Sequence, residues 1–164
     1  MSDPAGDSEF ALIDWVRRRV TSASPRLRVG IGDDAAELDL SETDGTLLAV
    51  DMLVEGVHFT FPDATPRQVG RKALAVNLSD IAAMGGTPLA ALVSVALPRG
   101  HGTKLAEELH EGLIELAGHY DVSLVGGDTT SSDGPLVISV TVLGLSPAGG
   151  PVLRSGARPG DVLL

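Results

Sequence analysis

Apolar segments of strand length alternate along this chain with two long segments of helical periodicity. Pro66 is suited to the first turn of one helix and Gly85 and Gly86 to its end near residue 84, while Thr103 can cap the other helix. The expected strands cover residues 47–54, 89–97, 122–125 and 136–145. Strands interleaved with two long helices predict an α+β domain in which helices cover one face of a mixed or antiparallel sheet.

The first 36 residues show weaker patterns. Residues 1–9 are polar and acidic, so we expect a disordered lead-in, and they lack the basic and apolar regions of a signal peptide. Ser8 can cap a helix whose apolar residues recur at helical spacing as far as Val20. We expect a loop over residues 21–28 and an irregular, glycine-punctuated segment over residues 28–36.

Composition narrows the classes of function. At 164 residues the chain is long enough for one core, and its 12 basic and 22 acidic residues give a net charge of −10. No basic stripe is present, so nucleic acid and anionic membranes are poor partners. The longest apolar run, residues 89–97, is shorter than the ~20 residues of a membrane span. The lack of cysteine excludes disulfides and thiolate metal sites and fits a cytoplasmic protein.

Aspartates stand in four glycine-rich or apolar frames where a solvent-facing charge is not expected. The frames are GIGDD with Asp33 and Asp34, LLAVD with Asp51, AVNLSD with Asp80, and VGGDT with Asp128. A buried carboxylate is costly unless it is paired or bound to a metal. Because carboxylate oxygens suit hard cations, the four frames together predict a magnesium site that holds phosphates.

Each frame also has a simpler explanation. GIGDDA fits a dinucleotide-binding pattern, although Asp33 and Asp34 would set two negative charges against a pyrophosphate, and a helix-capping aspartate in a glycine loop is a further alternative. Asp51 can be a charge that emerges at a strand end. Asn77 and Asp80, three residues apart on a helix, can form a hydrogen-bonded pair. Glycine–aspartate turns such as GGD are common.

Familiar catalytic motifs are absent from this sequence. It holds no Walker A pattern, no set of protein-kinase loops, no GxSxG and no HExxH. Phosphoryl transfer without a P-loop lysine depends on metal ions to neutralise charge, which a cluster of aspartates can bind.

Five segments in this order carry a resemblance: GIGDDAA, VDMLVEGVHF, KALAVNLSDIAAMGG, LVGGDTT and RSGARPGD. Together, over about residues 10–164, they resemble the thiamine-monophosphate kinases. That family belongs to a superfamily with aminoimidazole ribonucleotide synthetase, selenophosphate synthetase and a hydrogenase maturation factor. NLSDIAAMGG and GGDT indicate an ATP-using member of the superfamily, and VEGVHF with RSGARPGD indicates the thiamine branch.

The resemblance implies a fold, a domain organisation and an assembly. The expected fold is that of the aminoimidazole ribonucleotide synthetase N-terminal domain, whose sheets pair in a dimeric barrel, so we expect a homodimer. Residues 10–150 are the expected ATP- and metal-binding domain. Residues 151–164 are expected to begin the connection to a second domain, which family members carry and this sequence does not.

The resemblance also implies site residues. Magnesium ligands are expected at Asp34, Asp51, Asp80 and Asp128, with Asp33 in support. Ala49 and Val50 stand where the family commonly has Ser-Thr, so a hydroxyl ligand is lost there and a backbone carbonyl or water must replace it. ATP contacts are expected from Gly127, Asp128, Arg154 and His110, the last in place of a tyrosine common in relatives. His58 is expected to contact thiamine monophosphate.

The implied reaction is ATP- and magnesium-dependent phosphorylation of thiamine monophosphate to thiamine diphosphate. The acceptor phosphate is already ionised at neutral pH, so no general base is needed and catalysis is positioning and electrostatics. Two alternatives remain open at this point. One is another ATP-dependent superfamily member that activates an amide or a selenium donor, and the other is a non-catalytic domain that binds nucleotide and dimerises. The chain without a second domain is expected to show little turnover.

Overall fold

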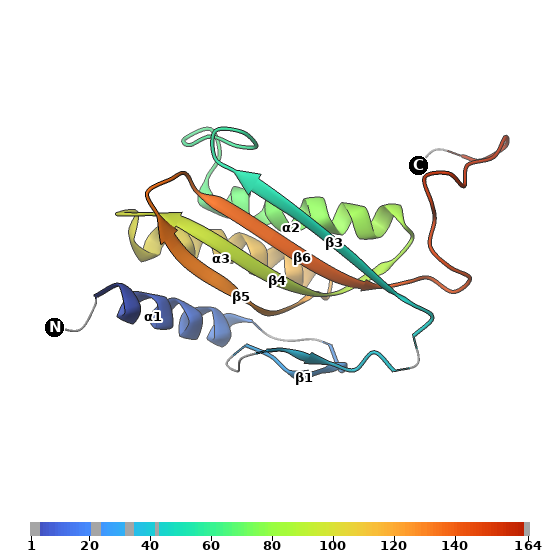
Figure 1. Ribbon diagram of the computed structural model, residues 1–164, viewed down its shortest axis with the longest axis horizontal. Helices are drawn as coiled ribbons and strands as arrows, with labels where there is room; N and C mark the ends of the chain where they lie inside the picture. The colour runs from blue at the N-terminus through green and yellow to red at the C-terminus, as the bar shows by residue number, and fades with distance from the viewer. Residues whose placement is uncertain (1–3, 21–23, 32–34, 42, 163–164) are drawn as a thin grey trace.

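The computed structural model describes residues 4–20, 24–31, 35–41 and 43–162. Its elements in chain order are α1 (Pro4–Arg19), β1 (Leu27–Val29), β2 (Glu37–Leu38), β3 (Thr46–Val54), α2 (Pro66–Ala83), β4 (Thr87–Pro98), α3 (Gly102–His119), β5 (Ser123–Ser132) and β6 (Val137–Leu145). Figure 1 views the main sheet from the side opposite to α2 and α3, with α1 and the β1–β2 hairpin beside the sheet. No described helix is long and apolar enough to cross a membrane.

The main sheet has four strands in the order β3-β6-β4-β5. β6 pairs antiparallel with both β3 and β4, whereas β4 and β5 are parallel and are joined through α3. The sheet is therefore mixed, as predicted for an α+β domain with helices on one face. A second, two-stranded sheet is formed by β1 and β2.

The core lies between the sheet and the two long helices. β6 alternates strictly, and its Ile138, Val140 and Val142 are completely buried on the helix side. α2 and α3 cross at two glycines, because a Cβ at Gly70 would lie 1.9 Å from the Leu109 carbonyl oxygen, and Gly112 is equally close to α2. The two backbones touch, which brings both helices onto the sheet as one layer.

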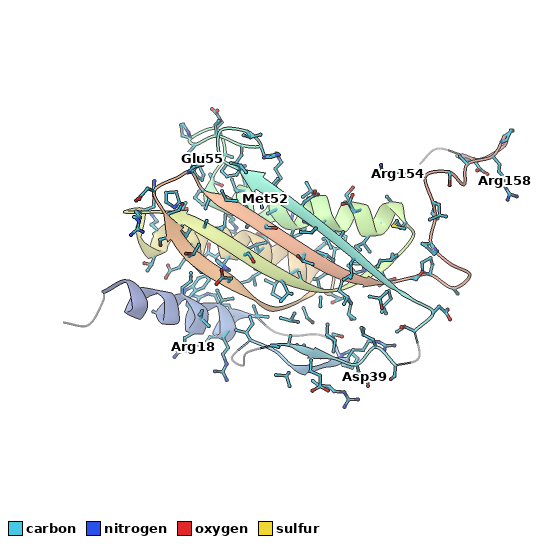
Figure 2. The ribbon with its side chains drawn as sticks, viewed as in Figure 1. Arg18, Asp39, Met52, Glu55, Arg154 and Arg158 are labelled. Atoms are coloured by element: carbon cyan, nitrogen blue, oxygen red, sulfur yellow. The ribbon has the colours of Figure 1, made fainter. Side chains whose placement is uncertain are left out.

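The opposite, open face of the sheet carries exposed apolar side chains. On β3, Leu48, Val50 and Met52 are 72%, 63% and 55% exposed, while their neighbours in sequence point toward the helices. Met52 lies on the near side of the sheet in Figure 2. Side chains of one strand alternate between faces, so this stripe follows from the period of two in β3.

Most predicted elements are confirmed, including the strands at residues 47–54, 89–97 and 136–145 and the helix at 66–84. The start of α2 is fixed by a capping box: Gln68 N donates to Thr65 Oγ1 (3.2 Å) and Thr65 N donates to Gln68 Oε1 (2.8 Å). Four boundaries or elements differ from the prediction. α1 begins at Pro4, where a proline fits the first helical turn, and not at Ser8.

The other differences concern α3, β5 and the β1–β2 hairpin. The N-cap of α3 is His101, without a side-chain cap bond, so Thr103 is inside the helix. β5 continues to Ser132 because its parallel pairing with β4 runs through the glycine pair, so Gly126 to Asp128 lie within a strand and not in a turn. β1 lies within residues 21–36, which were expected to be loop or irregular, and β2 follows directly after them; both strands are too short to show a periodic pattern.

Candidate functional site

A cavity of about 1130 Å³ opens beside β5, between the sheet and the segments that precede it in the chain. Residues of β4 and β5 form its floor, and residues of α1 and β2 form its far wall. Its polar lining residues are Asp14, Arg17, Ser94, His110, Asp128, Thr129 and Thr141. No residue of α2 lines it, so the cavity belongs to the open face and the β5 edge of the sheet.

Three of the predicted ATP contacts meet in this cavity: Gly127, Asp128 and His110. Gly127 packs directly against the backbone of β4, since a Cβ there would lie 1.8 Å from the Val93 carbonyl oxygen. The backbone of β5 is therefore bare at this point. Asp128 follows on the open face and is exposed.

Asp128 belongs to a polar row that crosses the open face. In the register of the sheet, Asp128 lies opposite Ser94, and Ser94 lies opposite Ser139 on β6. Neighbouring strands are ~4.8 Å apart, so a carboxylate and two hydroxyls follow one another across three strands. These serines were missed in the sequence, although each interrupts an apolar strand, in LVSVAL and VISVTV, and that interruption is a readable signal.

His110 is nearly buried on α3 and keeps a defined orientation. Its Nδ1 lies 2.8 Å from the Ala106 carbonyl oxygen, so Nδ1–H donates and Nε2 is left as an acceptor. Burial lowers the pKa of His110, partly offset by the hydrogen bond to Ala106. The ring is therefore neutral at neutral pH and brings no positive charge to the cavity.

The three predicted metal aspartates that the structure describes, Asp51, Asp80 and Asp128, are not gathered in one place within a single chain. Asp51 is half-buried on the helix-facing side of β3, and β3 and β5 are opposite edges of the sheet, about 14 Å apart. Asp80 is exposed on α2, which does not reach the cavity. Among the residues that the structure describes, no three His, Cys, Asp or Glu side chains come close enough to hold a metal ion.

Asp33 and Asp34 lie outside the described residues, so their role stays a prediction. Ile31 and Ala35, which flank residues 32–34, both line the cavity that contains Asp128. Asp128 therefore fits a cation bound at the cavity together with phosphates, whereas Asp51 and Asp80 do not fit that same site within one chain.

Ala49 and Val50 face opposite sides of the sheet. Val50 points to the open face, while Ala49 shares the helix-facing side with Asp51. Of these two positions, only 49 can therefore place a side chain on the same side of the sheet as the Asp51 carboxylate.

Asn77 and Asp80 do not form the hydrogen-bonded pair considered as an alternative. Asn77 is completely buried and its Nδ2 donates to the Ala73 carbonyl oxygen at 3.0 Å, while Asp80 is exposed. Asn77 Oδ1 has no partner. The expectation that Asp80 does not face solvent is wrong, because three residues on a helix turn far enough for one side chain to be buried and the other to reach solvent.

His58 and Arg154 lie apart from the cavity. His58 is exposed in the turn that follows β3, where its Nδ1 accepts a hydrogen bond from Val54 N at 3.0 Å. Arg154 is exposed in the C-terminal segment, well away from α1 and the open face in Figure 2. That segment is attached near the end of α2, where Val152 N donates to the Met84 carbonyl oxygen at 3.0 Å.

The domain is of the α+β class, with a mixed sheet that carries helices on one face and the cavity on the other. Residues 32–146 match the family described as AIR synthase related protein, N-terminal domain. The chain belongs to this family, and the fold class expected from the sequence is confirmed.

Relatives of known name match almost the whole chain. A thiamine-monophosphate kinase of Rhodopirellula baltica is 44% identical over 94% of this chain and 50% of its own length. The crystal structure of thiamine-monophosphate kinase from Stenotrophomonas maltophilia K279a is 40% identical, with a TM-score of 0.76 over 90% of this chain and 45% of that one. A structure described as AaThiL complexed with AMPPCP and TMP is 35% identical, with a TM-score of 0.66 over 96% and 48%. The chain thus spans about half the length of these relatives.

Proposed function

We propose that this chain is the nucleotide-binding half of a thiamine-monophosphate kinase, which transfers the γ-phosphoryl group of ATP to thiamine monophosphate and yields thiamine diphosphate. The observation that carries the proposal is the 44% identity over nearly the whole chain to a kinase of that name. The fold shared with a relative in complex with AMPPCP and TMP supports it. Because the chain spans half of such relatives, the activity is assigned to this chain together with a second half.

ATP is assigned to the cavity beside β5. Gly126 and Gly127 leave the backbone of β5 bare, so that phosphate oxygens can approach main-chain amides. The neutral His110 offers Nε2 as an acceptor at the same cavity. Arg154, whose planar guanidinium suits phosphates, must be brought to the nucleotide by a movement of the C-terminal segment or by another subunit.

The chain's contribution to the reaction is positioning and charge. The acceptor phosphate is an ionised nucleophile, so no side chain has to remove a proton. His58 is proposed to hold thiamine monophosphate. His58 does not line the cavity, so the proposal has donor and acceptor sites on different parts of the domain, with closure between them left to the second half.

Magnesium is part of the proposal as a cation shared by Asp128 and the nucleotide phosphates. When bound, it neutralises phosphate charge that this acidic chain cannot neutralise alone. Asp51 and Asp80 act as ligands only if a second copy or a second half brings phosphates to them.

A homodimer completes the proposal. The stripe of Leu48, Val50 and Met52 leaves apolar area on the open face, and a second copy of the same sheet can cover it in a closed barrel. A cytoplasmic location belongs to the same proposal, since ATP is the phosphoryl donor.

Calorimetry with AMPPCP tests the nucleotide site. Binding is expected to require magnesium, and Asp128→Asn is expected to remove that requirement together with most of the affinity. Asp133→Asn is the matched control, because Asp133 is also an exposed acid, directly after β5, and its pair with Arg99 is a surface ion pair worth little. Equal, magnesium-dependent binding by both variants would remove Asp128 from the site.

A further inference from the structure

The turn over residues 55–59, between β3 and α2, is held at its start by the neighbouring strand connection. Glu55 N donates to the Leu136 carbonyl oxygen at 3.0 Å, and Leu136 N donates to Glu55 Oε2 at 3.1 Å. Gly56 N donates to the Phe59 carbonyl oxygen at 2.8 Å, which closes the turn. Figure 2 shows Glu55 at the end of β3.

His58 is oriented by the backbone of the same turn. Its own N donates to the Val54 carbonyl oxygen at 2.9 Å, and its Nδ1 accepts from Val54 N at 3.0 Å. With Nδ1 used as an acceptor, the neutral ring carries its proton on Nε2. His58 therefore presents an N–H donor from an exposed position.

Lys72 is the side chain that fixes the peptide of His58. Its Nζ, on the exposed side of α2, donates to the His58 carbonyl oxygen at 2.6 Å. Lys72 has no ion-pair partner among the described residues. Ordering a lysine side chain costs conformational entropy, so this contact is maintained by a strong, charge-assisted bond.

The fold does not depend on Lys72. Phe59 is buried and its ring meets Phe61 edge-on at 5.5 Å between centroids, which anchors the turn in the core. α2 has its own capping box at Thr65. Loss of the lysine contact therefore releases the His58 peptide while the turn and the helix stay in place.

We propose that Lys72 is a positioning residue for His58: it fixes the peptide that carries the ring, so that Nε2–H is held as a donor toward an oxygen of the acceptor phosphate. The step that concerns thiamine monophosphate rests on the proposed function. The step that concerns the ring and its peptide rests on the contacts of this turn alone.

Nuclear magnetic resonance of the 164-residue chain tests, without any substrate, whether Lys72 fixes the ring and the peptide of His58. In the native chain the neutral His58 ring is expected as the Nε2–H tautomer. Lys72→Met is expected to give a mixture of tautomers. The Val54 amide proton is expected to exchange about 5-fold faster, because its hydrogen bond to His58 Nδ1 is weakened. Arg71→Met is the matched control, because Arg71 is adjacent, exposed and equally charged. An unchanged ring spectrum in Lys72→Met, or equal changes in both variants, would overturn the proposal, and Lys72→Arg is expected to restore the native spectrum.

Enzyme kinetics test the part of the proposal that concerns thiamine monophosphate. They are measured on the chain joined to a second half. Lys72→Met is expected to raise KM for thiamine monophosphate about 5-fold while KM for ATP stays within about 2-fold, and Lys72→Arg is expected to recover most of the loss. Equal increases in both KM values would contradict a positioning role. His58→Ala separates the two proposals: if it leaves the KM for thiamine monophosphate unchanged, the acceptor contact in the proposed function fails, and the spectroscopic result still decides the role of Lys72.

Discussion

At the scale of single residues, close backbone packing decides which side chain a position can hold. Gly127 shows this, because the approach of β5 to β4 leaves no room for a side chain. Gly127 also lines the cavity, where no side chain of its own covers the backbone. A glycine pair that reads in the sequence as a turn is thus part of a strand.

Gly127→Ala is expected to destabilise the fold by about 2–4 kcal/mol, because the new methyl group meets the Val93 carbonyl oxygen and the two strands must separate. Gly118→Ala is the control, since a Cβ at Gly118 meets no atom within 4 Å and alanine favours a helix. Urea unfolding measures both variants. Equal stability of Gly127→Ala and the native chain would refute the close contact of β4 and β5.

His110 makes the stability of the domain depend on pH. Burial lowers the pKa of His110 in the folded state, so below about pH 6.5 the unfolded chain binds a proton that the folded chain does not. Stability therefore falls as the pH falls from 6.5 toward the folded pKa, by at most ~1.4 kcal/mol per pH unit. His110→Gln, which does not titrate, is expected to show a shallower fall in urea unfolding between pH 6.5 and 5. The same dependence of stability on pH in both proteins would mean that folding does not lower the pKa of His110.

At the scale of elements, periodic pattern predicts most of the fold. The alternation in β3 and β6 and the helical spacing in α2 place these elements within one or two residues of their ends. The β1–β2 hairpin and the second half of β5 were not predictable in this way. Two- and three-residue strands have no period, and the polar residues of β5 after Asp128 pair with β4 through the backbone alone.

The site was predicted less well than the fold, for a physical reason. Sequence frames show which residues suit a cation, but not which face of a strand they occupy. Asp51 and Asp128 fall on opposite faces and edges of the sheet, while Gly127, Asp128 and His110 meet because β4, α3 and β5 form one βαβ unit. Distances between edges of a sheet depend on strand order, which no local pattern contains.

The contact of α2 with α3 depends on glycine. Gly112→Ala is expected to destabilise the domain by about 2–4 kcal/mol, because a Cβ would lie 1.9 Å from the Arg67 carbonyl oxygen and the helices must move apart. The exposed pair of Arg67 and Glu115 across the same helices contributes little, so Glu115→Gln is the control and is expected within about 0.5 kcal/mol of the native chain. Similar stability of both variants would contradict the direct backbone contact.

At the scale of the whole molecule, the proposed homodimer makes the open face of the sheet its interface. Val50→Lys places a charge in the middle of the apolar stripe, so a dimer that buries this face is expected to dissociate to monomers. Val57→Lys is the matched control, because Val57 is 74% exposed but lies in the turn after β3 and not on the sheet. Light scattering at tens of micromolar measures both. A native chain that is already monomeric, or a Val50→Lys chain that stays dimeric, would exclude this face as the interface.

The central claim is that this chain supplies the nucleotide-binding half of a thiamine-monophosphate kinase. The most direct test joins it after Leu164 to the second half of the Rhodopirellula baltica kinase, with that kinase's own two halves joined in the same way as the control. Magnesium- and ATP-dependent conversion of thiamine monophosphate to thiamine diphosphate is then measured. We expect turnover by the joined chain, little by the 164-residue chain alone, and loss of turnover in Asp128→Asn. An active control beside a joined chain that folds, binds ATP and forms no thiamine diphosphate would contradict the claim.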